Sequence, residues 1–118
     1  MINRRFVCFA FLILTLFIFN HAFASDTITG KVVSISDGDT ITVLDSGKTQ
    51  HKIRLYGVDC PESHQDFGNR AKQFTSDLVF GKTVSVKVMD TDRYGRTVGI
   101  VNIGSKTLNE EPVKAGFA

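Results

Sequence analysis

Acidic and basic side chains gather around one proline turn in the middle of the chain. The stretch Lys52 to Glu62, KIRLYGVDCPE, carries Arg54 before the turn and places Asp59 and Glu62 on either side of Pro61. The arginine guanidinium is a permanently charged planar fork that suits phosphate. Proline restricts the backbone of the turn that holds the two carboxylates. This combination indicates one half of a metal-dependent phosphodiesterase site.

Two other short segments carry the same residue types. One is D-G-D-T at Asp37 to Thr40, and the other is D-R-Y-G-R at Asp92 to Arg96. Each segment by itself is typical of an ordinary turn, because aspartate and glycine are favoured there. Both segments fall at the ends of predicted strands, as the proline turn does. In a small closed barrel such strand ends lie close together, which favours a shared site.

Together the three segments hold the groups that phosphodiester hydrolysis requires. Fixed cations meet the negative charge that develops on the phosphate oxygens, a base deprotonates the attacking water, and a hard metal ion assists both. The candidates are Arg54 and Arg96 as the cations, Glu62 as the general base, and Asp39 with Asp59 as metal ligands. Ligands that all offer oxygen favour calcium or magnesium over zinc.

The first residues have the pattern of a secretory signal peptide. Arg4 and Arg5 precede an apolar run from Phe6 to Phe19, and Ala22-Phe23-Ala24 supplies a cleavage site before Ser25. The alternative is an uncleaved membrane anchor, but the apolar run is shorter than the ~20 residues that a span needs. We therefore expect residues 1–24 to be a signal peptide, the protein to be secreted or periplasmic, and the mature chain to have no stable membrane association.

The charge of the chain changes when this segment is removed. Lys and Arg fall from 14 to 12, which equals the 12 Asp and Glu, so the mature chain has no formal net charge. Nucleic-acid binding must then depend on a local group of cations. Cys60 remains as a lone cysteine, which is consistent with a buried thiol, an intermolecular disulfide or a partner in missing sequence.

Periodicity divides residues 25–118 into strands and helices. β-Branched and alternating segments predict five strands, at Ile28–Ser36, Thr40–Leu44, Lys52–Tyr56, Thr83–Met89 and Thr97–Ile103. A helix is predicted over Phe67–Phe80, because Phe67, Ala71, Phe74 and Leu78 form one apolar stripe and Gly81 follows as a C-terminal signal. A last short helix is predicted from Asn109, as its N-cap, to Gly116.

Five short strands with a helix after the third predict one mainly β (α+β) domain. An open sheet of this size leaves its edges unpaired, whereas closure into a barrel removes them. The OB-fold is a five-stranded barrel of this kind. The alternative is an open α+β sheet.

The three motifs, in their order along the chain, resemble the staphylococcal nuclease (thermonuclease) family. The resemblance rests on D-G-D-T, R-L-Y-G-V-D-C-P-E and D-R-Y-G-R, and extends over Ile28 to Ala118. It implies an OB-fold and a calcium-dependent nuclease that cuts DNA and RNA and leaves 3'-phosphates. It also implies a longer domain, since the family usually continues beyond Gly116 to Ala118, so we expect the nuclease domain of residues 25–118 to be C-terminally truncated.

Roles for individual residues follow from the resemblance. Arg54, Glu62 and Arg96 correspond to the catalytic residues, and Asp39 and Asp59 correspond to carboxylate ligands of one calcium ion. Cys60 occupies a position that offers its backbone carbonyl to the metal. Arg93 and Tyr94 correspond to residues that contact the phosphate and base beside the scissile bond.

We therefore expect a monomeric, secreted nuclease that acts on DNA and RNA with little sequence preference. Calcium is the expected cofactor, in preference to magnesium. Two alternatives are a non-catalytic OB-fold module that binds nucleic acid or protein, and an inactive gene fragment. The non-catalytic module is disfavoured because Arg54, Glu62 and Arg96 are all present.

Overall fold

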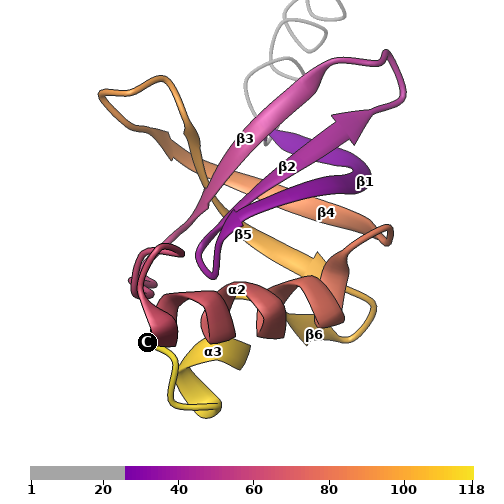
Figure 1. Ribbon diagram of the computed structural model, residues 1–118. Helices are drawn as coiled ribbons and strands as arrows, with labels where there is room; N and C mark the ends of the chain where they lie inside the picture. The colour runs from indigo at the N-terminus through magenta and orange to yellow at the C-terminus, as the bar shows by residue number, and fades with distance from the viewer. Residues whose placement is uncertain (1–25) are drawn as a thin grey trace, which may run out of the picture.

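The computed structural model describes residues 26–118, and the predicted signal peptide lies outside these residues. The described part contains six strands and two helices (Figure 1). The strands are β1 (Thr27–Asp37), β2 (Thr40–Asp45), β3 (Gln50–Leu55), β4 (Thr83–Thr91), β5 (Thr97–Ile103) and β6 (Lys106–Thr107). The helices are α2 (Asp66–Val79) and α3 (Glu111–Lys114).

Five of the strands form a closed barrel. β1 pairs with β2 and with β4, β2 pairs with β3, and β4 pairs with β5, all antiparallel. β3 then pairs with β5 in parallel, from Ile53 opposite Thr97 to Leu55 opposite Gly99, which closes the ring. This topology confirms the predicted OB-fold-like barrel and excludes the open sheet. β6 was not predicted, because two residues carry no readable periodicity.

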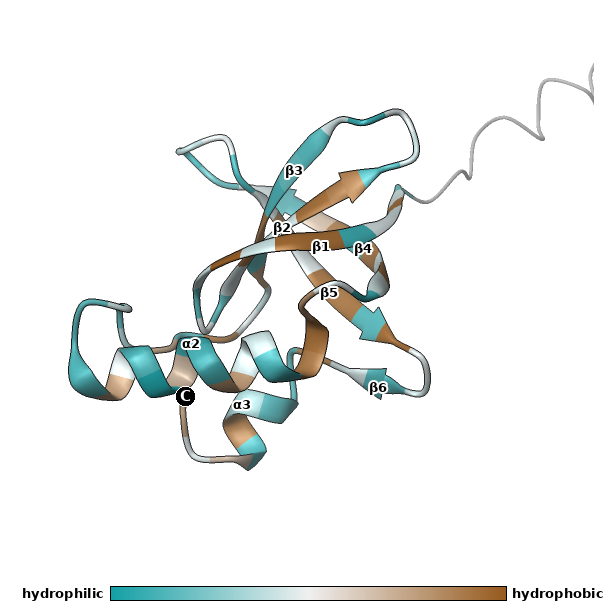
Figure 2. Cartoon of the chain, turned by 45° about the vertical axis from the view of Figure 1, so that its right-hand side comes forward, coloured by the Kyte–Doolittle hydropathy of each residue, from teal (hydrophilic) through white to brown (hydrophobic). Residues whose placement is uncertain are grey.

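The barrel interior is filled by aliphatic side chains from alternate strand positions. Residues with no exposed surface include Val32, Ile41, Val43, Ile53, Val86 and Val101. Hydrophobic residues follow the strands, whereas the loops between β2 and β3 and between β4 and β5 are largely hydrophilic (Figure 2). Burial of apolar side chains therefore sets the strand registers that position the polar residues at the strand ends.

Helix α2 lies across one end of the barrel, and its buried face matches the predicted stripe only at Ala71 and, in part, at Leu78 (Figure 1). The predicted helix is confirmed within a residue at each end. The interface is made by small side chains, at Gly68, Ala71, Thr75 and Val79. Phe67, the first residue of the predicted stripe, is 48% exposed, so its predicted burial is wrong. Small side chains make this interface because the helix lies directly against the backbone of the loop after β3, where an aromatic ring does not fit.

The aromatic residues of α2 instead pack beside the barrel. The rings of Phe67 and Phe74 lie 5.4 Å and 5.1 Å from the ring of Phe117, measured between centroids. Phe117 follows α3, so this small aromatic group joins the two helices below the barrel. Phe117 also packs against the core of the barrel, so the aromatic group helps to hold α2 in place.

The last helix is shorter than predicted, and Asn109 does not cap it. The residue before α3 is Glu110, which makes no side-chain cap, and Pro112 occupies the first turn, where its missing N–H is tolerated. The Asn109 side chain is buried and turned toward the barrel instead. Within residues 26–118 no helix is both long and apolar enough to cross a bilayer.

Candidate functional site

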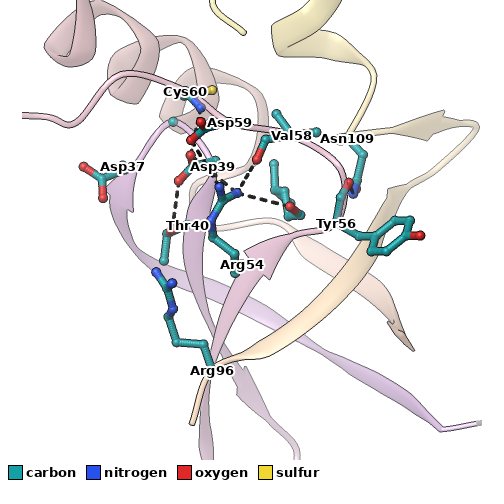
Figure 3. A network of polar contacts seen from close by, with 12 residues as sticks. Asp37, Asp39, Thr40, Arg54, Tyr56, Val58, Asp59, Cys60, Arg96 and Asn109 are labelled. Atoms are coloured by element: carbon teal, nitrogen blue, oxygen red, sulfur yellow. Dashed lines mark hydrogen bonds and ion pairs between the residues drawn. The ribbon is translucent and has the colours of Figure 1, made fainter. Parts of the chain in front are cut away.

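Arg54, near the end of β3, lies at the centre of a polar network (Figure 3). Its Nη1 atom lies 3.4 Å from Asp39 Oδ2, and its Nη2 atom lies 3.3 Å from Asp59 Oδ1. Nη1 also donates hydrogen bonds to the carbonyl oxygens of Leu55, at 3.2 Å, and of Val58. The structure thus places one guanidinium between both predicted metal-ligand carboxylates.

Asp39 is buried in the turn between β1 and β2, with 5% of its surface exposed. Its Oδ1 atom accepts a hydrogen bond from the Thr40 hydroxyl at 2.9 Å, and its Oδ2 atom accepts one from the Cys60 N–H at 2.8 Å. The carbonyl of Asp39 accepts a bond from the N–H of Leu55. The Asp39 side chain is therefore held in one orientation by hydrogen bonds to both of its oxygens.

The loop after β3 is fastened to the same turn. The N–H of Ser63 donates to Asp37 Oδ1 at 2.8 Å, which fixes the loop beyond Pro61. The Thr75 hydroxyl of α2 donates to the carbonyl of Gly38 at 2.6 Å. A Cβ atom at Gly38 would lie 2.9 Å from the Cβ of Ala71, so only glycine allows helix and turn to approach this closely. The D-G-D-T turn is therefore a packing element as well as a source of carboxylates.

Within residues 26–118, Cys60 is buried and forms no disulfide bond. Burial and the nearby negative charge of Asp39 raise the pKa of the thiol to about 11. A thiol with such a pKa is protonated at neutral pH and is a poor nucleophile. Cys60 contributes to this site through its backbone, because its N–H donates a hydrogen bond to Asp39.

Arg96 lies at the same pocket as Arg54, although it comes from a separate segment of the chain. It follows the turn between β4 and β5, and its Nε atom lies 2.7 Å from Asp92 Oδ2. An open pocket of about 480 Å³ is lined by Arg54, Leu55, Gly57, Val58, Asp59, Asp92, Arg96 and Val98. The parallel pairing of β3 with β5 is what brings the two arginines to one pocket.

Glu62 stands apart from this pocket. Its side chain is 73% exposed, and its Oε2 atom lies 3.4 Å from Nδ1 of His64, which is itself 71% exposed. Glu62 does not line the pocket that Arg54 and Arg96 share. The structure therefore brings together the two predicted catalytic cations, whereas the predicted base lies on the adjoining loop and faces solvent.

Arg93 and Tyr94 form an exposed group at the tip of the β4–β5 turn. Tyr94 is 69% exposed, and its hydroxyl accepts a hydrogen bond from Arg93 Nη2 at 3.0 Å. The guanidinium carbons of Arg93 and Arg96 lie 5.0 Å and 5.4 Å from the centroid of the Tyr94 ring. Cation–π contact thus links the tip of the turn to the pocket arginine.

The described residues form no preassembled metal site, although they include side chains of the kinds that bind hard cations. Over residues 26–118 there is no group of three or more His, Cys, Asp or Glu side chains close enough to hold an ion. Asp39 and Asp59 do converge on one point, which the Arg54 guanidinium occupies. Carboxylate and carbonyl oxygens are what calcium and magnesium prefer, so the residues fit a hard divalent ion in kind.

Sequence reasoning missed the part played by Asp92. Its carboxylate accepts hydrogen bonds from the backbone and from the side chain of Arg96. Burial raises the pKa of Asp92, but the bonds from the Arg96 N–H and guanidinium and from the Tyr94 N–H outweigh it and hold the pKa below its usual range. The position four residues before Arg96 was a readable signal, but an aspartate that opens a turn is too common to single out.

Comparison with known proteins gives the context for this geometry. A family profile described as "Staphylococcal nuclease homologue" matches residues 52–118. A protein of Haemophilus influenzae named "Uncharacterized endonuclease" is 40% identical over 118 residues, which cover 100% of this chain and 65% of the relative. An "Uncharacterized endonuclease" of Escherichia coli O157:H7 is 43% identical over 106 residues, 89% of this chain and 69% of the relative.

A named nuclease is also similar. The "Thermonuclease" of Staphylococcus hyicus is 38% identical over 98 residues, which cover 76% of this chain and 57% of that protein. The chain thus spans between half and about two thirds of the length of these relatives. The profile match over more than half of the chain and the identity to these relatives lead to one conclusion: the chain belongs to the staphylococcal nuclease family.

Proposed function

We propose that this protein is a calcium-dependent nuclease that hydrolyses phosphodiester bonds of DNA and RNA with little sequence preference, leaving 3'-phosphates. The observation that carries the proposal is the convergence of Arg54 and Arg96 on one open pocket beside Asp59. Two fixed guanidinium groups at a concave, solvent-accessible surface suit a phosphodiester, whose oxygens gain negative charge in the transition state.

The two arginines play different parts in this proposal. Arg54 is tied to Asp39 and Asp59, so its charge is already shared with carboxylates. Arg96 has one carboxylate partner, Asp92, and its side chain is 28% exposed. Arg96 is therefore the cation with more capacity to bind the scissile phosphate, while Arg54 organises the floor of the pocket.

Glu62 is the proposed general base. Its carboxylate is exposed to water, so it can accept a proton from a water molecule that approaches the phosphate. The loop that carries Glu62 is anchored next to it, by the bond from the Ser63 N–H to Asp37. Glu62 reaches the reacting phosphate only when substrate occupies the pocket, because catalytic contacts often tighten only in the complex.

Asp39, Asp59 and the carbonyl of Cys60 are the proposed ligands of one calcium ion. When bound, such an ion supplies positive charge to the phosphate oxygens and increases the acidity of water. In the chain itself, the buried Asp39 provides the fixed ligand and the exposed Asp59 provides an adaptable one. A divalent ion at this point competes with Arg54 for both carboxylates.

Tyr94 and Arg93 are the proposed contacts for the neighbouring nucleotide. An exposed tyrosine ring stacks on any base, which supports low sequence preference. We also propose that the protein is exported by means of residues 1–24 and acts as a monomer. Export is tested by mass spectrometry of the N-terminus of the mature protein, which is expected to begin at Ser25.

The direct test is an assay of nuclease activity on the full chain. Labelled DNA and RNA oligonucleotides are incubated with calcium or with a calcium chelator, and product ends are identified by their sensitivity to a 3'-phosphatase. We expect cleavage with calcium and none with the chelator. Arg96→Ala and Glu62→Gln are each expected to lower the rate by ~100-fold or more, the scale for loss of one transition-state contact.

Arg70→Ala is the matched control for the loss of a cation. Arg70 is an exposed arginine on α2 that does not line the pocket, so this variant is expected to retain full activity. If Arg96→Ala and Glu62→Gln both cut substrate as fast as the parent chain does, the assignment of the site is wrong. Binding of oligonucleotide without any product would instead favour the non-catalytic alternative.

A further inference from the structure

The carboxylate of Asp92 accepts hydrogen bonds from three donors. Oδ1 accepts them from the backbone N–H of Tyr94 at 3.0 Å and of Arg96 at 2.9 Å. Oδ2 accepts one from Arg96 Nε at 2.7 Å. The turn is further closed by the Asp92 N–H, which donates to the carbonyl of Arg96. One oxygen of Asp92 therefore shapes the turn, and the other contacts the arginine side chain.

This division fixes the orientation of the Arg96 guanidinium. The group is planar, so a short bond at Nε determines which way its two terminal nitrogens point. Among residues 26–118 those terminal nitrogens make no hydrogen bond to protein, and the side chain lines the pocket. Figure 3 shows the Arg96 side chain extending from the start of β5 toward the network around Arg54. Asp92 thus binds the guanidinium at Nε and leaves the two terminal nitrogens free to bind a ligand.

A contact with the Tyr94 ring also helps to orient the Arg96 guanidinium. The guanidinium carbon of Arg96 lies 5.4 Å from the centroid of the Tyr94 ring. Asp92 also holds the backbone N–H of Tyr94, so the carboxylate and the ring belong to one turn. The Asp92 side chain is only 20% exposed, which limits competition from water for the bond to Nε.

We propose that Asp92 is the positioning residue for Arg96, and that it orients the guanidinium toward the scissile phosphate. The inference rests on the proposed function and deepens it, because nothing in the motif resemblance assigns a role to Asp92. Asp92 does not touch substrate in this proposal. It acts through Arg96 alone, and this is the property that the experiment tests.

Asp92→Asn separates the two tasks of the carboxylate. Its amide oxygen still accepts the two backbone N–H bonds, so the turn is retained. The amide nitrogen then faces Arg96 Nε, and two donors oppose each other. We expect the thermal melt to stay close to that of the parent chain. We expect kcat to fall by about 10-fold to 100-fold, the scale for a misplaced catalytic group, with little change in KM.

A double-mutant cycle tests whether the effect passes through Arg96. Rates are measured for the parent chain, Asp92→Asn, Arg96→Ala and the double variant, with calcium. In the Arg96→Ala background, Asp92→Asn is expected to cause no further loss, because the group that it positions is absent. If the two losses multiply, Asp92 acts independently of Arg96 and the positioning role is overturned.

Two further variants serve as controls. Asp90→Asn changes a nearby exposed aspartate that accepts a bond only from the N–H of Thr91, and it is expected to leave the rate unchanged. Asp92→Glu keeps the charge and is expected to recover part of the rate lost in Asp92→Asn. If Asp92→Asn unfolds, the same cycle is run with Asp92→Glu. A parent chain without nuclease activity overturns the proposed function as well, whereas an active parent with multiplying losses overturns only the role of Asp92.

Discussion

Two arginines reach the same pocket, but their partners differ. Arg54 contacts two carboxylates and two carbonyls, whereas Arg96 contacts the single carboxylate of Asp92. A guanidinium group that already pairs with several acceptors binds an additional anionic ligand less strongly than a guanidinium group with one partner. At the scale of single residues, the site therefore consists of a rigid floor at Arg54 and a more available cation at Arg96.

The reactivity of Cys60 provides a residue-scale prediction. A rise in the thiol pKa from 9.0 to about 11 lowers the thiolate fraction at pH 8 by roughly 100-fold. We expect Ellman's reagent to label Cys60 at least ~100-fold more slowly in the native chain than in guanidinium chloride. The measurement uses a Cys8→Ser variant, so that only Cys60 reacts. Rapid stoichiometric labelling of the folded chain would contradict the burial of this thiol.

The same pKa shift fixes the sign of a pH effect. The folded state favours the protonated thiol, so the contribution of Cys60 to stability is complete below pH 9. It is lost as the pH rises from 9 toward 11.

Some side-chain roles were readable from the sequence and others were not. The alternating pattern placed His51 beside the β3 strand, where its Nε2 atom lies 2.7 Å from Oδ2 of Asp45 at the end of β2. The roles of Asp92 and Asn109 were missed. Both residue types are typical of turns and caps, so only coordinates distinguish an ordinary turn residue from one that holds a distant partner.

Helix α2 positions the site through its smallest residues, which is a feature of the element as a whole. Gly68 lies against the backbone of the Pro61–Glu62 segment, and a Cβ atom there would lie 1.6 Å from the carbonyl oxygen of Glu62. The start of the helix and the loop that carries the proposed base are thus in direct backbone contact. Any side chain at this point must move Glu62.

Gly68→Ala tests this contact. We expect it to destabilise the fold by about 1–3 kcal/mol, the usual cost of overpacking, and to lower nuclease activity by displacing Glu62. The measurement is urea unfolding followed by circular dichroism, together with the oligonucleotide assay. Gly47→Ala is the control, since its Cβ atom would meet only Asp45 Oδ1 at 3.4 Å. Equal stability of the two variants would show that the helix and loop adjust freely.

The elements themselves were largely predictable. Strand β5 has the predicted bounds, and β4 extends two residues beyond the predicted Met89. The buried face of α2 was predicted only in part. Ala71 and Leu78 pack against the core as predicted, but hydrophobic periodicity selects large apolar residues and the interface also uses Gly68 and Thr75. Close approach to backbone selects for small side chains, and this is a tertiary constraint without a local pattern.

Closure of the barrel is the property of the whole molecule on which the pocket depends. Asn109 contributes to it from outside the strands. Its amide nitrogen donates to the carbonyls of Tyr56 at 2.9 Å and Gly99 at 3.1 Å, and its oxygen accepts the N–H of Val101 at 2.9 Å. One buried side chain therefore joins the end of β3 to β5, beside the parallel pairing that closes the ring.

Asn109→Ala is expected to weaken this closure. It leaves the Val101 N–H and the Tyr56 carbonyl without this partner, whereas the Gly99 carbonyl still accepts the N–H of Tyr56. An unpaired buried group costs about 1–3 kcal/mol, so we expect a loss of about 2 kcal/mol. Denaturant unfolding measures the change. Asn69→Ala, at an exposed position on α2, is the control and is expected to stay within ~0.5 kcal/mol of the parent chain. A similar small effect for Asn109→Ala would show that the strand pairing alone closes the barrel.

The parallel pairing of β3 with β5 also determines at which stage of folding the pocket forms. Ile53 meets Thr97 only after the intervening helix and β4 have taken their places, so this contact spans a long loop and forms slowly. Neither half of the chain can assemble the pair of arginines by itself. Recovery of the proposed nuclease activity during refolding is therefore expected to lag behind recovery of the helical signal, because the pocket is complete only once the barrel has closed.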